Sequence, residues 1–199
     1  MANVEPRESR AMAADSITLE LRAEIRENAL HVGYGITNRD SRSLVSFDGA
    51  IGIGGGEFPD LTGNCYVSSA GPGSVRLMRI RPPAHPTKDT PRTYIPPAAE
   101  VKPGETRRVR FGLALPLKER SEFSPDFSGA AYVKQAVTRL ELRIGYFWKT
   151  EDTVLQVLTP PNVWRVVKGA PLSQIFQVVA EAPVNCELLV RSDEKFIRM

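Results

Sequence analysis

A two-residue alternation of apolar and polar side chains is the feature that most limits what this chain can fold into. The clearest run covers residues 17–26 (ITLELRAEIR), and a second covers residues 30–36 beyond a turn marked by Asn28. Successive side chains of a strand point to opposite faces, so each run predicts a strand with one apolar face. A third apolar run at residues 44–53 follows turn-forming residues 38–41. Three strands joined by short turns predict a meander rather than a βαβ unit.

The same kind of pattern recurs along the rest of the chain. Further strands are predicted at residues 65–69, 75–81, 109–115, 140–148, 153–158, 163–167, 175–180 and 184–190. No window of ten or more residues has a clear helical period, although residues 132–140 favour a short helical turn. About eight to eleven short strands separated by turn signals predict an all-β fold, a sandwich or a partly open barrel.

The chain of 199 residues fits one domain. Residues 1–15 lack apolar periodicity and predict a flexible N-terminal tail, and residues 16–199 predict a single β-sandwich in which 153–199 form an added layer of strands. Seven prolines between Pro82 and Pro103 predict an extended connection that crosses an edge or changes sheets. Pro103-Gly104 fits the centre of a type II turn.

Charge and hydropathy narrow the possible partners and compartment. The net charge is only +3, from 26 basic and 23 acidic residues that are interspersed, which argues against nucleic acid. No apolar run approaches the roughly 18 residues that cross a bilayer, which argues against a membrane protein. The first 15 residues lack the apolar region of a signal peptide, so a cytoplasmic location is favoured over a periplasmic one.

The two cysteines, Cys65 and Cys186, are predicted to be free, buried thiols. A disulfide between them would require an oxidising compartment.

Two segments, HVGYGITNRDSRSL (31–44) and VKPGETRRVRFGLALPL (101–117), combine a strand ending in an asparagine turn with a Pro-Gly-Glu turn that feeds a strand. Residues 16–148 on this basis resemble bacterial immunoglobulin-like domains, among them the intracellular proteinase-inhibitor family. The resemblance implies an immunoglobulin-like antiparallel β-sandwich, here with extra C-terminal strands. It implies no functional residue.

Several motifs could carry chemistry, and each has a simpler structural interpretation. The glycine-rich run at residues 52–56 could cradle a phosphate, but no helix or Lys-Ser/Thr follows it, so a loop is favoured. Glu57 and Asp60 could help to bind calcium, although the further oxygen ligands are missing. His31 and His85 lack the partners of a zinc site. We therefore predict neither a metal site nor a cofactor.

Charged clusters could also carry a function, and each of them has a simpler structural interpretation. Glu119, Glu122 and Asp126 could form a catalytic carboxylate group, and a solvated acidic loop is favoured. The arginines of the predicted strands could form a basic stripe, but acidic residues at comparable outward positions favour cross-strand ion pairs. These arginines are Arg76, Arg79, Arg81, Arg107, Arg108, Arg110, Arg139 and Arg143.

The leading hypothesis is a non-enzymatic protein-binding or assembly module whose partner is another protein or a second copy of itself. The alternatives are a structural subunit of a large phage- or secretion-type assembly, a proteinase-inhibitor-like domain, and a carbohydrate-active hydrolase that uses the acidic loop. A sandwich binds mainly through its loops, which here are residues 52–60, 82–97 and 118–127. The proposed partner surface comprises Phe58, Asp60, His85, Phe123 and Phe147, the last being the aromatic expected to face outward.

Overall fold

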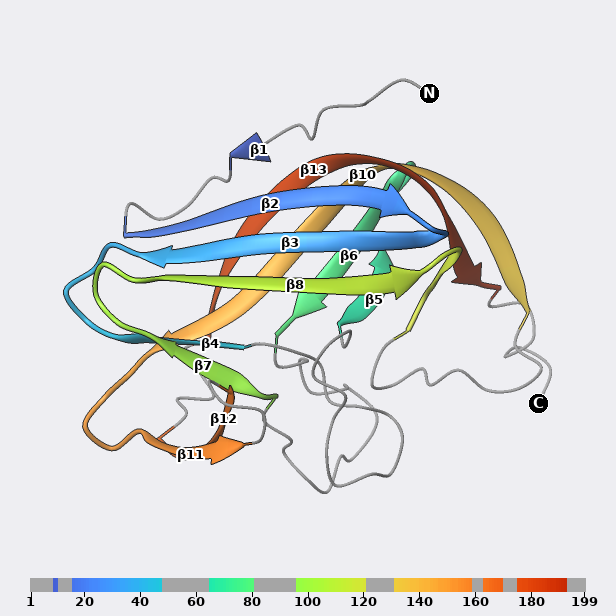
Figure 1. Cartoon of the computed structure of the whole chain (residues 1–199). Coiled ribbons are helices and arrows are strands. Elements are labelled where there is room, and N and C mark those ends of the chain that lie inside the picture. Colours follow the sequence, from blue (N-terminus) through green and yellow to red (C-terminus); the bar gives the residue numbers. More distant parts are fainter. Residues whose placement is uncertain are drawn as a thin grey trace, which may run out of the picture.

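The computed structural model describes residues 9–10, 16–47, 65–80, 96–120, 131–158, 163–169 and 175–192. All regular structure in these residues is β-strand, which confirms the all-β class (Figure 1). No helix that could span a membrane occurs in the part of the chain so described.

Four strands form the front sheet of Figure 1, in the order β1-β2-β3-β8. Their bounds are β1 (Ser9–Arg10), β2 (Ile17–Arg26), β3 (Ala29–Asn38) and β8 (Thr106–Ala114). A two-residue turn joins β2 to β3, and both of its residues, Glu27 and Asn28, have positive φ (48° and 60°). That conformation matches the twist of the two strands that it joins. Because β1 pairs with β2, residues 9–10 are strand and not the free tail expected there.

Nine strands form the back sheet. In Figure 1 its strands β5, β6, β10 and β13 lie behind the front sheet and run across it, while β4, β7, β11 and β12 lie below. The order is β11-β12-β7-β4-β10-β13-β9, with β6 pairing both β10 and β5. Their bounds are β4 (Leu44–Phe47), β5 (Tyr66–Ser69), β6 (Ser74–Arg79), β7 (Ala98–Val101), β9 (Leu117–Lys118), β10 (Tyr132–Trp148), β11 (Val154–Leu158), β12 (Val163–Lys168) and β13 (Phe176–Arg191).

The pairing departs from the sequence predictions in two ways. The predicted meander is wrong, because β4 leaves the front sheet and pairs with β7 and β10 in the back sheet. The strands are also not all antiparallel, since β6 runs parallel to β10 and β9 runs parallel to β13.

The two longest strands were each predicted as broken pieces. Residues 132–140 continue β10 and form no helical turn, while residues 176–191 form one strand, β13, and not two. Pro183 lies between the two predicted pieces of β13, and proline cannot donate to a ladder. In the structure Pro183 pairs with Arg139 beside a register shift in β10, and the amides of Thr138 and Arg139 donate to Gly73 of another segment. The irregularity therefore accommodates the proline without ending the strand.

The main core lies between the inner faces of the two sheets. The alternating apolar residues of β3, and those of β2 as far as Leu21, are almost completely buried, as the periodicity predicted, and they share one core cluster with Leu140, Leu142 and Ile144 of β10. Near the end of β2 the burial stops, since Ile25 is 39% exposed. Burial of this kind stabilises a fold by roughly 25 cal/mol for each Å² of apolar surface removed from water. The core therefore explains why this face of every long strand is apolar.

A second apolar cluster lies on part of the other face of the back sheet, where β4, β7, β10 and β12 meet, and it overturns the prediction for Phe147. Alternation does turn Phe147 away from Tyr146 and Trp148, but the side chain is fully buried and not exposed. Its ring lies 6.0 Å from that of Phe47, and Val45, Ala98 and Val166 complete the cluster. Phe147 is therefore a core residue and not part of a partner surface.

Gly145 tests the tightness of the packing beside this cluster. A Cβ at Gly145 would lie 2.9 Å from Phe47 Cδ2 and 3.2 Å from the Ile80 backbone. We expect Gly145→Ala to lower the free energy of unfolding by about 1–3 kcal/mol, because neighbouring atoms must shift. Gly33→Ala is the control, since its Cβ would meet only Arg110 Cγ at 3.8 Å. Urea unfolding measures both, and an equal loss in the two variants would contradict the tight packing.

Candidate protein-binding surface

Four of the five predicted surface residues, Phe58, Asp60, His85 and Phe123, lie outside the described residues. So do the glycine-rich run, Glu57, Glu122 and Asp126. Glu119 is described, and it holds strand β13: its Oε2 accepts a hydrogen bond from the Arg191 amide (3.1 Å). His31 is exposed on the front sheet, and no cluster of three metal-ligating side chains occurs among the described residues.

The cysteines are both free, as predicted. Cys65 is buried in the main core, whereas Cys186 is only half-buried. Burial raises the pKa of each thiol, so both favour the unreactive protonated form.

Ion pairs account for Arg76, Arg139 and Arg143 of the back sheet, as the sequence predicted, whereas the prediction fails for Arg108 and Arg110 of β8, which form no ion pair with a described residue. Glu141 of β10 pairs with Arg76 on β6 and with Arg143 (2.6 Å), and Arg139 lies 3.8 Å from Glu181. Burial by itself would raise the pKa of Glu141, but the hydrogen bonds from Arg143 and Arg76 outweigh it and lower that pKa. This cluster is therefore satisfied within the sheet.

Arg79 is an exception, because it is buried between the two sheets (1% exposed). Its guanidinium lies 4.1 Å from the ring centre of Phe111 on β8, and Nη1 donates to Tyr34 Oη (3.4 Å) on β3. A guanidinium over an aromatic ring is an attractive arrangement. Arg79 thus joins β6 to the front sheet and cannot belong to a surface stripe.

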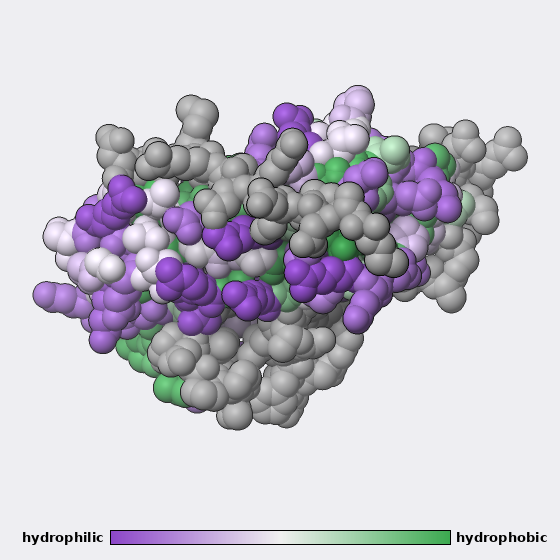
Figure 2. All heavy atoms as spheres, turned by 45° about the horizontal axis from the view of Figure 1, so that its top comes forward, coloured by the Kyte–Doolittle hydropathy of each residue, from purple (hydrophilic) through white to green (hydrophobic). Residues whose placement is uncertain are grey.

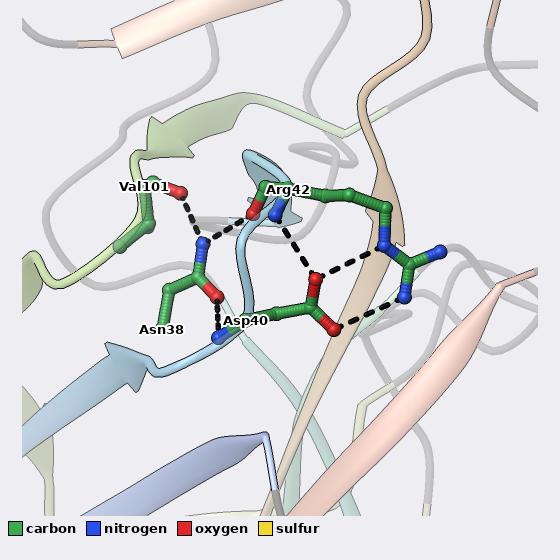
Figure 3. A network of polar contacts seen from close by, with 4 residues as sticks. All are labelled: Asn38, Asp40, Arg42 and Val101. Carbon is green, nitrogen blue, oxygen red and sulfur yellow. Dashed lines mark hydrogen bonds and ion pairs between the residues drawn. The ribbon is translucent and has the colours of Figure 1, made fainter.

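The buried side chain of Asn38 is the centre of a polar network at one end of the two sheets (Figure 3). Its Nδ2 donates to the carbonyl oxygens of Arg42 (2.7 Å) and Val101 (3.0 Å), and its Oδ1 accepts from the Asp40 amide (3.0 Å). Its backbone also pairs with Glu105 and Gly104. One residue therefore holds the β3–β4 connection against the β7–β8 connection.

Asp40 extends this network to the surface. Its carboxylate accepts two hydrogen bonds from the Arg42 guanidinium (3.0 and 3.1 Å), and that guanidinium lies 4.1 Å from the ring centre of Trp148. The hydrogen bonds from Arg42 lower the pKa of Asp40 to about 2. The arrangement shapes the connection and leaves no polar group aimed at a ligand.

The outer face of the front sheet presents three rows of side chains. In the strand register, Gly35 of β3 lies between Glu20 of β2 and Arg108 of β8. Two residues further along, Gly33 lies between Arg22 and Arg110 in the same way. The glycines let longer neighbours lean across β3, since the Cβ position of Gly35 lies 3.8 Å from Glu20 Oε2 and 3.9 Å from Arg108 Cγ. Figure 2 shows hydrophilic residues across much of the coloured surface, with smaller apolar areas between them.

Strand β8 is an edge of the front sheet, and no described strand pairs with its outer side. Hydrogen bonds at the two ends of the β3–β8 pair show which residues of β8 direct their backbone groups toward this outer side. The Leu115 amide donates to Asn28, and the Asn38 amide donates to Glu105, so the odd-numbered residues bond to β3. In an antiparallel pair, successive residues of a strand direct their backbone N–H and C=O groups alternately toward the partner strand and away from it. Arg108, Arg110 and Gly112 therefore direct their backbone groups toward the open edge.

A surface hollow of about 690 Å³ lies where β8 begins. Charged side chains dominate it, and its lining residues are Glu100, Val101, Lys102, Glu105, Thr106, Arg107 and Arg108. Both of its carboxylates already have partners: Glu100 pairs with Lys149 Nζ (2.9 Å), and Glu105 accepts from the Lys102 amide (3.1 Å).

A second open edge lies at β11, the outermost strand of the back sheet at that side. The hairpin of β11 and β12 exposes three valines, namely Val154 (48%), Val157 (67%) and Val167 (57%). The strand sequence VLQVL contains neither charge nor proline, the two devices that commonly protect an edge.

The chain matches no protein-family model, and no similar curated protein and no similar solved structure was found. The immunoglobulin-like resemblance stays a prediction.

Removal of the Asn38 side chain tests how much its network stabilises the fold. We expect Asn38→Ala to reduce the free energy of unfolding by about 2–4 kcal/mol, because buried backbone groups lose their partners. Arg39→Ala is the control, since this neighbour is exposed and should change stability by no more than about 0.5 kcal/mol. Denaturant unfolding measures both. Similar stability of the two variants would show that the amide is dispensable.

The ion pair of Asp40 with Arg42 makes the stability of the fold depend on pH. The folded-state pKa of Asp40 is below its usual value of 3.8, so the ionised carboxylate stabilises the fold above that pH. This contribution is lost as the pH falls from about 4 toward about 2. At about pH 5 the melting temperature of wild type should therefore be higher than that of Asp40→Asn, and this difference should disappear at about pH 2. Arg42→Gln should show the same trend, and a gap independent of pH would contradict the assignment.

Proposed function

We propose that this protein is a non-enzymatic protein-binding or assembly module on an immunoglobulin-like framework. The observation that carries the proposal is the open edge of β8, a nine-residue strand that contains the exposed Arg108 and Arg110. An open edge offers unpaired backbone donors and acceptors that another chain can complete. The framework is supported by two sheets with facing apolar sides and by connections that pass from one sheet to the other.

The charged groups of the described residues fit this proposal. Glu141 and its arginines, Asp40 with Arg42, and Glu119 all support the fold. The exposed arginines of β8 have no such structural use among the described residues.

A second candidate, a structural subunit of a larger assembly, is favoured by the β11–β12 hairpin. Exposed valines on an uncharged edge strand suit contact between identical copies, because such a strand can pair with itself across a two-fold axis. Val157→Lys would place a charge on that edge. Sedimentation should then show wild-type oligomers that Val157→Lys abolishes, and a wild-type monomer at high concentration would contradict this candidate.

The binding proposal is tested by comparing captured proteins and not by capture alone. Immobilised wild type and the double-edge variant Arg110→Pro/Val157→Lys are exposed to extract of the source organism. Arg110→Pro removes only an amide that faces the open side, so the β3–β8 ladder is retained, and thermal melting verifies the fold. We expect at least one protein to be enriched by about tenfold on wild type, a difference of about 1.4 kcal/mol. Equal capture by both would overturn the proposal.

A further inference from the structure

The open edge of β8 combines backbone and side-chain features that together specify a ligand. The residues whose backbone groups face the open side, Arg108 and Arg110, also point their side chains to the outer face of the front sheet. A strand added to β8 would hydrogen-bond to these residues and lay its own alternate side chains beside the two guanidinium groups.

The two arginines have no acidic partner in the described part of the chain. Both are exposed, and neither takes part in any ion pair there, in contrast to Arg76, Arg139 and Arg143. Glu20 lies nearest in the register, across Gly35, but it forms no ion pair with Arg108. Two positive charges at alternate positions therefore stay available to a ligand on this face.

The hollow at the start of β8 also favours an acidic ligand. Its carboxylates, Glu100 and Glu105, are held by Lys149 and by the Lys102 amide, while the Lys102 side chain has no ion pair among the described residues. The basic character of the edge thus continues beyond Arg108. An acidic group in this hollow would lie near basic side chains, and the two carboxylates there are already bonded to Lys149 and to the Lys102 amide.

The opposite edge of the same sheet shows this mode of pairing within the chain. The two-residue strand β1 pairs antiparallel with β2, with Ser9 opposite Leu21 and Arg10 opposite Glu20. An extended segment of the chain thus completes the β2 edge by backbone pairing. The β8 edge lacks a described partner.

We infer that β8 binds an extended acidic segment of a partner protein by strand addition, with Asp or Glu at alternate positions facing Arg108 and Arg110. This inference rests on the proposed binding function and names the chemistry of the partner. Main-chain hydrogen bonds supply affinity, and the arginine pair supplies selectivity, because guanidinium–carboxylate contacts are strong and directional. A nucleic acid could meet the charge but not the row of backbone donors and acceptors.

The test is a binding titration with a fluorescent peptide of about seven residues that has glutamate at alternate positions, the spacing that strand geometry requires. We expect Arg108→Glu/Arg110→Glu to weaken binding by about tenfold or more. The matched control is Arg165→Glu/Lys168→Glu, which makes the same change of charge at exposed positions of β12 and should bind like wild type. Equal weakening in both double variants would overturn the inference.

Two further measurements separate strand addition from simple attraction of charge. Bound peptide should slow amide hydrogen exchange of Arg108, Arg110 and Gly112, and Arg110→Pro/Gly112→Pro should lose peptide binding although Arg108 is kept. A peptide of the same composition with its glutamates in one block should bind at least about tenfold more weakly. Equal affinity for the block peptide, or tighter binding of single-stranded DNA at β8, would overturn the inference.

Failure of the acidic-segment inference and failure of the proposed binding function give different results in these experiments. If the double-edge variant loses partners from the extract while the alternating peptide does not bind wild type, the inference fails and the binding function stands. If peptide binding requires Arg108 and Arg110 and slows exchange along β8, the inference is supported whatever the extract contains.

Discussion

The buried amide of Asn38 is the interaction on which the arrangement of the two sheets depends. The described chain crosses between the sheets after β3, after β7 and after β8, and Asn38 bonds to the first two of these crossings through its side chain and its backbone. A buried amide without partners would be costly, so these bonds act as a set. Gly104, with φ of 77°, supplies the tight turn that lets the second crossing reach Asn38.

With the crossings fixed, the long strand β10 organises the back sheet. It pairs along its length with β13 on one side and with β6 and β4 on the other. Polar groups on these strands bond to neighbouring elements. Glu141 joins β10 to β6 through Arg76, and Arg79 contacts the aromatic side chains of the front sheet. The edges at β8 and β11 differ because their outer backbone groups meet no described strand. This contrast between satisfied interior and open edge underlies both functional proposals.

Sequence patterns predicted the strands well where one face is apolar and the other polar. β2, β3, β8 and the second half of β10 follow their alternation, and the Pro103-Gly104 turn has its predicted hydrogen bond from Glu105 to Lys102 (3.0 Å). The short strand β7 was missed inside a proline-rich segment, because its four residues become a strand only by pairing with β4 and β12. β13 was predicted as two strands, because two local apolar runs do not show that both pair with one neighbour, β10.

The candidate site was less predictable. Arg108 and Arg110 carry the same sequence signal as Arg76 and Arg143, and only the neighbouring strand decides which of them meets a glutamate. Phe147 was expected to be exposed because alternation reports which face a residue occupies but not whether that face is covered.

The sequence by itself determined the all-β class, the inward-facing residues of the main strands and the turn at Gly104, because these follow from local periodicity and backbone preference. The tertiary structure alone decided the crossing fixed by Asn38, the second cluster around Phe147, the buried place of Arg79 and the open edge of β8. Each of these depends on which distant segments become neighbours, and a local pattern of side chains carries no information about that choice.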